Sequence, residues 1–204
     1  MEINKVIKKI PDKQYDGKST TSRMWKTDLY DFFKNKENNN VLEIGTCVGW
    51  TSYILSYIFN EVYTIENSPH NIKQAKINCK DSNNINFIQG NAYSDETYKN
   101  LPKYFDAVVI DCIHTYDSVI SDINRALEYM DPDKGIYLIF DDYSHPKSEP
   151  SYGVRVAIDD SIKEGLDFER HIGQGEGYKI NRNNGTSMTL AGPEGIILSY
   201  GIKK

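Results

Sequence analysis

The amino-acid sequence predicts a doubly wound α/β domain, and three observations support this fold class. From about residue 40 onward, short apolar runs alternate with segments of helical periodicity, which is typical of βαβ units around a parallel sheet. A glycine-containing turn joins the first apolar run to the helix that follows it. The 204 residues are 39% hydrophobic and 26% charged, which suits one domain with a large buried core.

Five apolar runs are the expected strands of the parallel sheet. They cover residues 40–44, 62–66, 85–89, 107–111 and 135–140. Ser68 and Pro69 predict the N-cap and first residue of a helix that runs toward Lys80. A second helix is expected to bury Val119, Ile123, Ala126, Leu127 and Met130, and to end before Pro132 and Gly135. A third is expected to bury Val154, Ala157, Ile158 and Ile162, and to end at Gly165.

The two ends of the chain complete the predicted fold. Residues 168–172 and 196–200 are expected to be late strands that pair antiparallel at one edge of the sheet. A helix around residues 24–33 is expected to lie over the ligand-binding edge, and residues 19–25 to approach the ligand from above. No internal repeat or linker divides the chain. We therefore expect a single domain, with residues 1–39 as a cap segment and residues 40–204 as the core.

Charge and composition exclude several classes of protein. The net charge of −5 and the pI of about 5.4 argue against a surface for nucleic acid or anionic membrane, which would need a basic face. No apolar stretch is long enough to span a bilayer, and the first residues lack the apolar core of a signal peptide. Cys47, Cys79 and Cys112 have no metal-binding spacing. Reduced thiols and a cytoplasmic location are the expectation.

The turn after the first strand has the features of a ligand-binding loop. Gly45 and Gly49 allow a ligand to approach the backbone, and the helix N-terminus that follows favours negative charge. Their spacing is G-x-x-x-G, which departs from the dinucleotide fingerprint G-x-G-x-x-G and suits a smaller ligand than a pyrophosphate. This spacing also disfavours a nicotinamide oxidoreductase. The alternative is that both glycines only shape a tight turn.

Two further polar residues follow predicted strands. Glu66 ends the second strand about 20 residues after the turn, where an acid can reach ribose hydroxyls. Asn91 follows the third strand and could contact an adenine edge. A carboxylate at a strand end and an asparagine in a turn are also common without any ligand. Both residues nevertheless lie at the carboxyl ends of strands, where doubly wound sheets bind ligands.

Acidic residues gather after the fourth and fifth strands. Asp111 ends the fourth strand, His114 follows it by three residues, and Asp141 and Asp142 end the fifth. If these strands are neighbours, about 4.8 Å apart, three carboxylates converge at one rim. Such a cluster needs a cation, a proton or an arginine, and carboxylate oxygens suit Mg²⁺ or Ca²⁺. The alternative is that the aspartates end a strand and cap a turn. His145 is a weaker candidate for the acceptor pocket.

The order of these motifs resembles the class I S-adenosylmethionine-dependent methyltransferases. The matching segments are VLEIGTCVGWTS, VYTIE, IQGNAYS and FDAVVIDCIHTY. The resemblance implies a Rossmann-like seven-stranded sheet, mostly parallel with an antiparallel edge strand near the C-terminus. It also implies S-adenosylmethionine as the cofactor. The residues that it assigns to cofactor binding are Glu43, Gly45, Thr46, Gly49 and Trp50 in the first motif, Glu66 at the ribose, Asn91 and Ala92 at the adenine, and Asp111. Cys47 stands where the commoner motif has a middle glycine.

A second pair of segments, DCIHTY and FDDYSHP with YGVRVAIDD after it, is similar to the macrocin-type sugar O-methyltransferases. This similarity implies that Asp111, Asp141 and Asp142 bind Mg²⁺, and that His114 is the general base beside Asp111. The expected reaction is methylation of a hydroxyl of a sugar, glycan or other small molecule. The chain is shorter at its N-terminus than many such relatives. We therefore expect either a homo-oligomer or part of a larger glycan-modifying protein.

Three other functions remain open at this stage. A catechol-type O-methyltransferase would use a similar acidic site with an aromatic acceptor wall, and the 15 tyrosines allow one. A nucleic-acid methyltransferase is disfavoured by the acidic pI and by the lack of an N/D-P-P-Y motif. A non-catalytic module that binds S-adenosylmethionine would not need the aspartate–histidine cluster.

Overall fold

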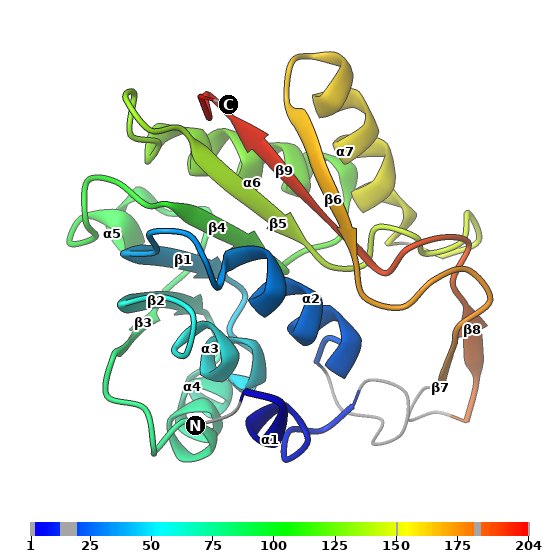
Figure 1. The fold of residues 1–204 in the computed structure, drawn as a ribbon, viewed down its shortest axis with the longest axis horizontal. Coiled ribbons are helices and arrows are strands. Elements are labelled where there is room, and N and C mark those ends of the chain that lie inside the picture. The colour runs from blue at the N-terminus through cyan, green and yellow to red at the C-terminus, as the bar shows by residue number, and fades with distance from the viewer. Residues whose placement is uncertain (1–2, 13–19, 150, 182–184, 204) are drawn as a thin grey trace.

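The computed structural model describes residues 3–12, 20–149, 151–181 and 185–203, and its centre is a seven-stranded sheet (Figure 1). The strands of this sheet are β1 (Asn40–Ile44), β2 (Glu61–Glu66), β3 (Ile85–Gln89), β4 (Ala107–Ile110), β5 (Ile136–Phe140), β6 (Asp167–Ile172) and β9 (Gly195–Tyr200). Their order across the sheet is β3-β2-β1-β4-β5-β9-β6. The five predicted parallel strands are therefore confirmed, with ends within one residue of the prediction.

The direction of the strands matches the predicted fold class. β1 pairs in parallel with β2 and β4, and β2–β3 and β4–β5 are parallel too. β9 runs antiparallel to both β5 and β6, so the predicted antiparallel pair at one edge is confirmed. Within this pair β6 is the outer strand. The chain thus forms a doubly wound Rossmann-like sheet whose order reverses between β1 and β4, which places a ligand crevice at their carboxyl ends.

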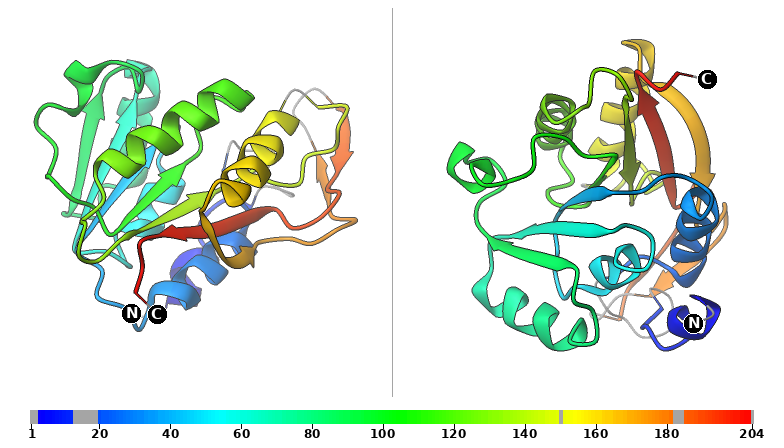
Figure 2. Two further views of the ribbon diagram at one scale, coloured as in Figure 1. Left: turned by 90° about the horizontal axis from the view of Figure 1, so that it is seen from above. Right: turned by 60° about the vertical axis from the view of Figure 1, so that its left-hand side comes forward.

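Helices cover both faces of the sheet. They are α1 (Ile3–Ile7), α2 (Arg23–Phe33), α3 (Trp50–Leu55), α4 (Pro69–Asn78), α5 (Asp95–Tyr98), α6 (Tyr116–Glu128) and α7 (Tyr152–Lys163). The views in Figure 2 show α6 and α7 on one side of the sheet and α2 on the other. The helices predicted from their caps and apolar faces are confirmed as α4, α6 and α7. Ser68 caps α4 and Thr115 caps α6, each through a side chain that accepts a backbone N–H.

Alternate residues of the strands point into two separate cores. One core joins Leu42, Val108 and Leu138 to apolar residues of α6 and α7. The other joins Val41, Val109 and Ile139 to α2, which contributes Trp25, Leu29 and Phe33. β1, β4 and β5 are therefore buried on both faces, which explains why these three strands are continuous apolar runs in the sequence.

The predicted position of α2 is wrong, although its existence is confirmed. We expected this helix over the ligand-binding edge, but its apolar residues pack against one face of the sheet. Its stripe of Trp25, Leu29 and Phe33 is fully buried, and this burial places the helix body on the face. Only its first turn reaches the carboxyl edge, where Trp25 Nε1 lies 3.4 Å from the carbonyl oxygen of Phe140. Of the segment 19–25, Ser19 lies outside the described residues.

The structure contains elements that the sequence analysis did not predict. Val6 and Ile7 of α1, together with Ile10 after it, pack on Ile54 of α3. A small hairpin of β7 (Lys179–Asn181) and β8 (Ser187–Thr189) lies between β6 and β9 in the chain. Its return strand is followed by Ala191, whose N–H donates to the carbonyl oxygen of Ser144 after β5. Over the residues that the structure describes, no helix has the length and apolar character of a membrane span.

Candidate active site

Gly45, directly after β1, has a backbone conformation that requires glycine. Its φ is 108°, and a Cβ at this position would lie 2.0 Å from the carbonyl oxygen of Asp111. Gly45 and Thr46 both donate their backbone N–H to the carbonyl oxygen of Ile65, each at 3.1 Å. The loop after β1 is therefore tightly packed against the ends of β2 and β4, as a loop that approaches a ligand with its backbone must be.

Cys47 and Glu66 fix the rest of this loop. Cys47 has a φ of 48°, in the left-handed region that glycine adopts most readily, and it stands where the commoner motif has a glycine. Its N–H donates to Glu66 Oε2 at 2.8 Å, and the N–H of Ser68 donates to Glu66 Oε1 at 2.8 Å. Glu66 thus joins the loop to the start of α4. Each of its oxygens retains a lone pair for a ligand hydroxyl.

The side chains of Glu43 and Thr46 lie beneath the loop. Glu43 is only 1% exposed, and its Oε2 accepts hydrogen bonds from Ser52 and from Thr64, the latter at 2.5 Å. Burial raises the pKa of Glu43 to about 8, although the two hydroxyl donors lower it. Thr46 Oγ1 lies 2.5 Å from Thr64 Oγ1. Both side chains therefore have partners within the protein, and their predicted role in cofactor binding stays a prediction.

Gly49 and Trp50 are placed by packing of the helices. Gly49 has a φ of 83°, and a Cβ there would lie 2.8 Å from Ala75 Cβ in α4. This contact supports the alternative that Gly49 shapes the turn. Trp50 packs on the cluster of Ile54 with α1 residues such as Val6. For both residues, cofactor contact remains a prediction.

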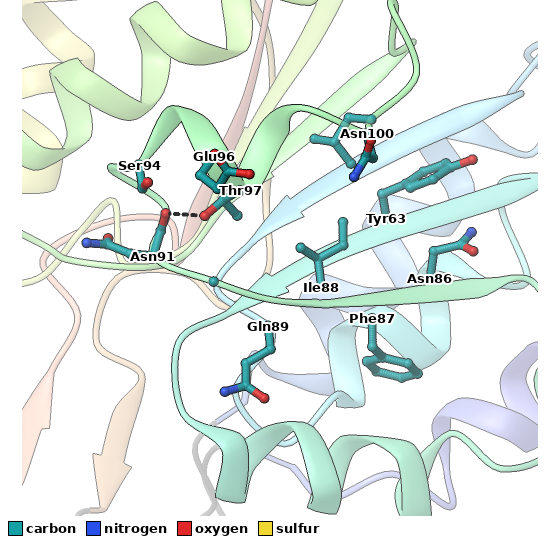
Figure 3. Close-up of a pocket in the computed structure, with 12 residues that line it drawn as sticks. Tyr63, Asn86, Phe87, Ile88, Gln89, Asn91, Ser94, Glu96, Thr97 and Asn100 are labelled. Atoms are coloured by element: carbon teal, nitrogen blue, oxygen red, sulfur yellow. Dashed lines mark hydrogen bonds between the residues drawn. The ribbon is translucent and has the colours of Figure 1, made fainter.

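Asn91 and Ala92 follow β3 in a compact turn. Asn91 Oδ1 accepts the N–H of Tyr93 at 3.0 Å, and its carbonyl oxygen accepts the hydroxyl of Thr97 at 2.8 Å (Figure 3). Ala92 is buried, and its carbonyl oxygen accepts the Tyr98 hydroxyl at 2.9 Å. The side-chain amide nitrogen of Asn91 donates to no group in the described part of the chain, so it can donate to a ligand.

A groove of about 600 Å³ runs along β3 beside α5. Figure 3 shows that residues of β3 and of the segment after it form its walls. Among them are Tyr63, Asn86, Ile88, Gln89, Asn91 and Asn100. Only Asn91 belongs to the predicted cofactor residues, and Asp111, His114 and Asp142 do not line the groove. Despite its size, this groove is therefore not where we place the chemistry.

The aspartate–histidine cluster assembles at the carboxyl ends of β4 and β5. These strands are neighbours with Ile110 opposite Phe140, so the residues that follow them meet at one rim. His114 Nε2 lies 3.2 Å from Asp111 Oδ1 and 3.6 Å from Asp142 Oδ2. One ligand atom from each of the three residues lies within 4.8 Å of the others. Of the three carboxylates predicted to converge here, Asp111 and Asp142 are therefore observed together, with His114 beside both.

The carboxylates determine the charge of His114. Its partial burial disfavours the charged ring, but the hydrogen bond to Asp111 and the charges of Asp142, Asp111 and Asp141 outweigh that effect. Together they raise the pKa of His114 to about 9. In the absence of any other cation the histidine is therefore itself the positive group among the carboxylates. Groups with strongly shifted pKa values are characteristic of functional sites.

Asp141 is close to this cluster but outside its innermost set. Asp141 is buried, with 5% of its surface exposed, and its negative charge helps to raise the pKa of His114. Among the described residues, the group with metal-ligand spacing contains His114 and does not contain Asp141. The ligand role predicted for Asp141 is therefore not tested by this arrangement and remains a prediction.

Two residues near the cluster make contacts with it that the sequence analysis did not predict. His145 is 6% exposed, and its Nε2 lies 2.8 Å from Asp142 Oδ1. It follows Asp142 by three residues, the spacing of His114 after Asp111, which was the available signal. Gly153 at the start of α7 was missed. A Cβ there would lie 2.6 Å from Tyr116 N and 3.1 Å from the carbonyl oxygen of His114. The start of α7 therefore packs against the loop between β4 and α6 that carries His114.

Several known proteins similar to this chain are methyltransferases. Residues 42–143 match the family described as methyltransferase domain. A segment of 65 residues is 38% identical to the protein-L-isoaspartate O-methyltransferase of Pyrococcus abyssi, and this match spans 30% of each protein. The chain also resembles solved structures at lower identity. They include an O-methyltransferase from Bacillus cereus in complex with S-adenosylhomocysteine (TM-score 0.64, 18% identity, 97% of this chain and 88% of that one).

Another similar structure is the N-methyltransferase NodS from Bradyrhizobium japonicum in complex with S-adenosylhomocysteine. Its TM-score is 0.58 at 15% identity, over 85% of this chain and 83% of that one. The same fold therefore accompanies both O- and N-methylation. The acceptor has to be inferred from the site and not from the fold.

Proposed function

Because the chain belongs to the methyltransferase domain family, we propose that it transfers a methyl group from S-adenosylmethionine to a hydroxyl of a sugar or glycan. The observation that supports this proposal most is the position of His114. Its Nε2 lies within reach of Asp111 and Asp142 at the carboxyl rim of the sheet. The glycine loop that would hold the cofactor contacts the same rim, because Gly45 packs on the backbone of Asp111.

The cofactor would lie across the carboxyl ends of β1, β2 and β3. The backbone of Gly45 would face its methionine part, Glu66 would accept the ribose hydroxyls, and Asn91 would donate to the adenine edge. The oxygens of Glu66 retain acceptor capacity after binding Cys47 and Ser68, which supports this assignment. The similarity in fold to the S-adenosylhomocysteine complex from Bacillus cereus also supports it.

The acidic rim fits a divalent cation. Asp111 and Asp142 present oxygens to one small volume, and three negative charges at one rim repel each other unless a positive group neutralises them. Oxygen ligands suit Mg²⁺, and we assign Asp111, Asp142 and the adjacent Asp141 to it. When bound, such a cation would lower the pKa of an acceptor hydroxyl and offset the carboxylate charge.

The proton of the acceptor hydroxyl would pass to His114. Asp111 and Asp142 both face Nε2 of His114, at 3.2 Å and 3.6 Å, and together they orient the ring. As the oxygen attacks the methyl carbon, the bond from that carbon to the cofactor sulfur breaks and S-adenosylhomocysteine leaves. For His114 to take the hydroxyl proton, its ring must be neutral with the proton on Nδ1, and a cation that offset the carboxylate charges would lower its pKa toward that state. Much of the rate enhancement would come from holding the acceptor oxygen in line with the methyl group and the sulfur.

The choice of a sugar acceptor rests on the sequence segments DCIHTY and FDDYSHP. The Pyrococcus abyssi relative is named for a protein acceptor, but its match covers too little of either chain to transfer that acceptor. A module that only binds S-adenosylmethionine would have no use for a histidine between two carboxylates. The decisive assay is transfer of radiolabelled methyl groups from S-adenosylmethionine to sugars and to catechols, with Mg²⁺ and with EDTA.

Labelling of a sugar that is lost in EDTA is the expected result of this assay. Labelling of catechols alone would show that the acceptor is aromatic. Equal rates in Mg²⁺ and EDTA would remove the cation from the mechanism while leaving the methyltransferase in place.

His114→Ala tests the assignment of the base. We expect turnover to fall by about 10²–10⁴-fold, the usual contribution of a general base. Binding of S-adenosylhomocysteine, measured by isothermal titration calorimetry, should change by less than about threefold. His70→Ala, an exposed histidine on α4, is the matched control and should keep full turnover. An equal loss of cofactor affinity in the His114 variant would contradict this division of roles.

A further inference from the structure

We propose that His145 and Ser151 position the Asp142 carboxylate, so that its Oδ2 faces His114 and the cation site. The cation in this inference comes from the proposed function. The contacts among His145, Ser151 and Asp142 lie outside the cofactor loop. The two residues lie in the loop between β5 and α7, and neither belongs to the assigned cation ligands.

His145 is held beside Asp142 in a buried setting. Only 6% of the residue is exposed, and its Nε2 lies 2.8 Å from Asp142 Oδ1. The ring N–H is out of line with that oxygen, so the contact is short but not a well-formed hydrogen bond. Within the described residues Nε2 has no hydrogen-bond partner. Because a buried polar atom without a partner is costly, the adjacent carboxylate is the group that can satisfy it.

Ser151 is the partner through which the protonation of the His145 ring can be set. Its Oγ makes a short contact with His145 Nδ1. Ser151 occupies the N-cap position of α7, yet its side chain makes no capping hydrogen bond to the helix. The hydroxyl is therefore committed to the imidazole. When it donates to Nδ1, the proton of the neutral ring lies on Nε2, which faces Asp142.

The backbone of Asp142 has a φ of 57°, in the left-handed region that aspartate adopts more readily than most residues. The side chain is 10% exposed, and its two oxygens have different neighbours. Oδ1 faces His145, and Oδ2 lies 3.6 Å from His114 Nε2. The close contact of His145 Nε2 with Oδ1 restricts the rotation of the carboxylate and keeps Oδ2 facing His114.

His145 contacts Asp142 in the way expected of a residue that supports a metal ligand without binding the metal itself. Ligating carboxylates are commonly hydrogen-bonded on their other oxygen, and loss of that partner typically weakens metal binding by about 10–100-fold. His145 would therefore act through Asp142 and would not touch the acceptor. It also links the site to α7, since Ser151 and Gly153 bring the start of that helix against the histidines.

The test compares His145→Leu, His145→Gln and wild type in titrations with Mn²⁺ alone, followed by electron paramagnetic resonance. The glutamine amide can place a donor near the position of Nε2, whereas leucine cannot. We expect His145→Leu to bind Mn²⁺ about 10–100-fold more weakly and His145→Gln to stay within about threefold of wild type. Ser151→Ala should give an intermediate loss. His70→Leu, on the surface, is the control for replacing a histidine by leucine.

Thermal unfolding of each variant separates positioning from folding. A loss of Mn²⁺ affinity in His145→Leu with rescue by His145→Gln, at a similar melting temperature, supports the proposal. Equal affinity in His145→Leu and wild type overturns it. If wild type itself binds no Mn²⁺, the cation of the proposed function is contradicted. The crystal structure of His145→Leu then decides the inference, because an unmoved Asp142 carboxylate would overturn it and a rotated one would support it.

Discussion

At the scale of single residues, burial sets the chemistry of two carboxyl groups that take no part in the proposed reaction. Asp122 in α6 is 1% exposed, and its Oδ2 has no hydrogen-bond partner among the described residues. Burial raises the pKa of Asp122 to about 7, and the charge of His114 lowers it slightly. Burial likewise raises the pKa of Glu43, to about 8. Both groups are most stable in the fold as neutral acids.

Asp122→Asn tests this view through the dependence of stability on pH. The folded protein keeps the Asp122 proton up to about pH 7, whereas the unfolded chain loses it near pH 4. Between these values the folded state binds more protons, so stability falls as pH rises. The asparagine side chain cannot ionise and removes this loss. In urea unfolding we expect the variant to gain about 2–4 kcal/mol on wild type between pH 4 and pH 8.

The matched control for this experiment is Asp81→Asn, an exposed aspartate, which should follow the wild-type curve. A difference between Asp122→Asn and wild type that does not change with pH would contradict a raised pKa for Asp122.

Gly45→Ala tests the close packing of the cofactor loop. The added Cβ would collide with the Asp111 carbonyl oxygen, and a φ of 108° is unfavourable for alanine. We expect a loss of about 2–4 kcal/mol in the free energy of unfolding, measured in urea. Gly175→Ala is the control, because a Cβ there meets nothing within 4 Å. A Gly45→Ala protein as stable as this control would show that the loop is looser than described.

At the scale of elements, a buried glutamate joins segments that are distant in the sequence. Glu194, directly before β9, is 1% exposed. Its Oε1 accepts the N–H of Ser22 at 2.8 Å, and its Oε2 accepts the Ser22 hydroxyl and the N–H of Gln174 at 3.0 Å. Since Ser22 is the N-cap of α2, one carboxylate holds the start of that helix, the loop after β6 and the start of β9 together.

Glu194→Gln should therefore loosen α2 at its first turn. The amide keeps one acceptor but places an NH₂ group against a donor, and the charge is lost. We expect a loss of about 2–3 kcal/mol in the free energy of unfolding, with faster hydrogen exchange at the amide of Trp25. Glu176→Gln, an exposed glutamate in the same region, should change neither quantity. Unchanged exchange at Trp25 would show that other contacts hold this helix.

The elements also show what the sequence could and could not predict. The strands, α4, α6 and α7 were predictable because apolar periodicity and caps such as Ser68 are local signals. The place of α2 was not, because burial of Trp25, Leu29 and Phe33 against one face depends on the whole sheet. The convergence of Asp111 with Asp142 followed from strand order. The burial of Glu43 and Thr46 beneath the loop depends on partners such as Thr64, which no motif indicates.

At the scale of the whole molecule, the sheet order accounts for the position of the site. The order reverses between β1 and β4, so the cofactor loop after β1 and the acidic rim after β4 and β5 lie at one edge. Helices support both loops: Gly49, before α3, packs against Ala75 of α4, and Gly153 of α7 packs against the backbone of His114. The central claim is that this edge binds S-adenosylmethionine beside an acidic rim that carries out the transfer.

The most direct test of that claim is calorimetric titration of S-adenosylhomocysteine into wild type, Glu66→Ala and Glu61→Ala. The two glutamates stand at opposite ends of β2, and Glu61 is bound to Asn86 and not to the loop. We expect binding to wild type and Glu61→Ala, and at least about tenfold weaker binding to Glu66→Ala, since two hydrogen bonds to ribose are lost. Absence of binding to wild type, or equal binding to all three proteins, would contradict the account.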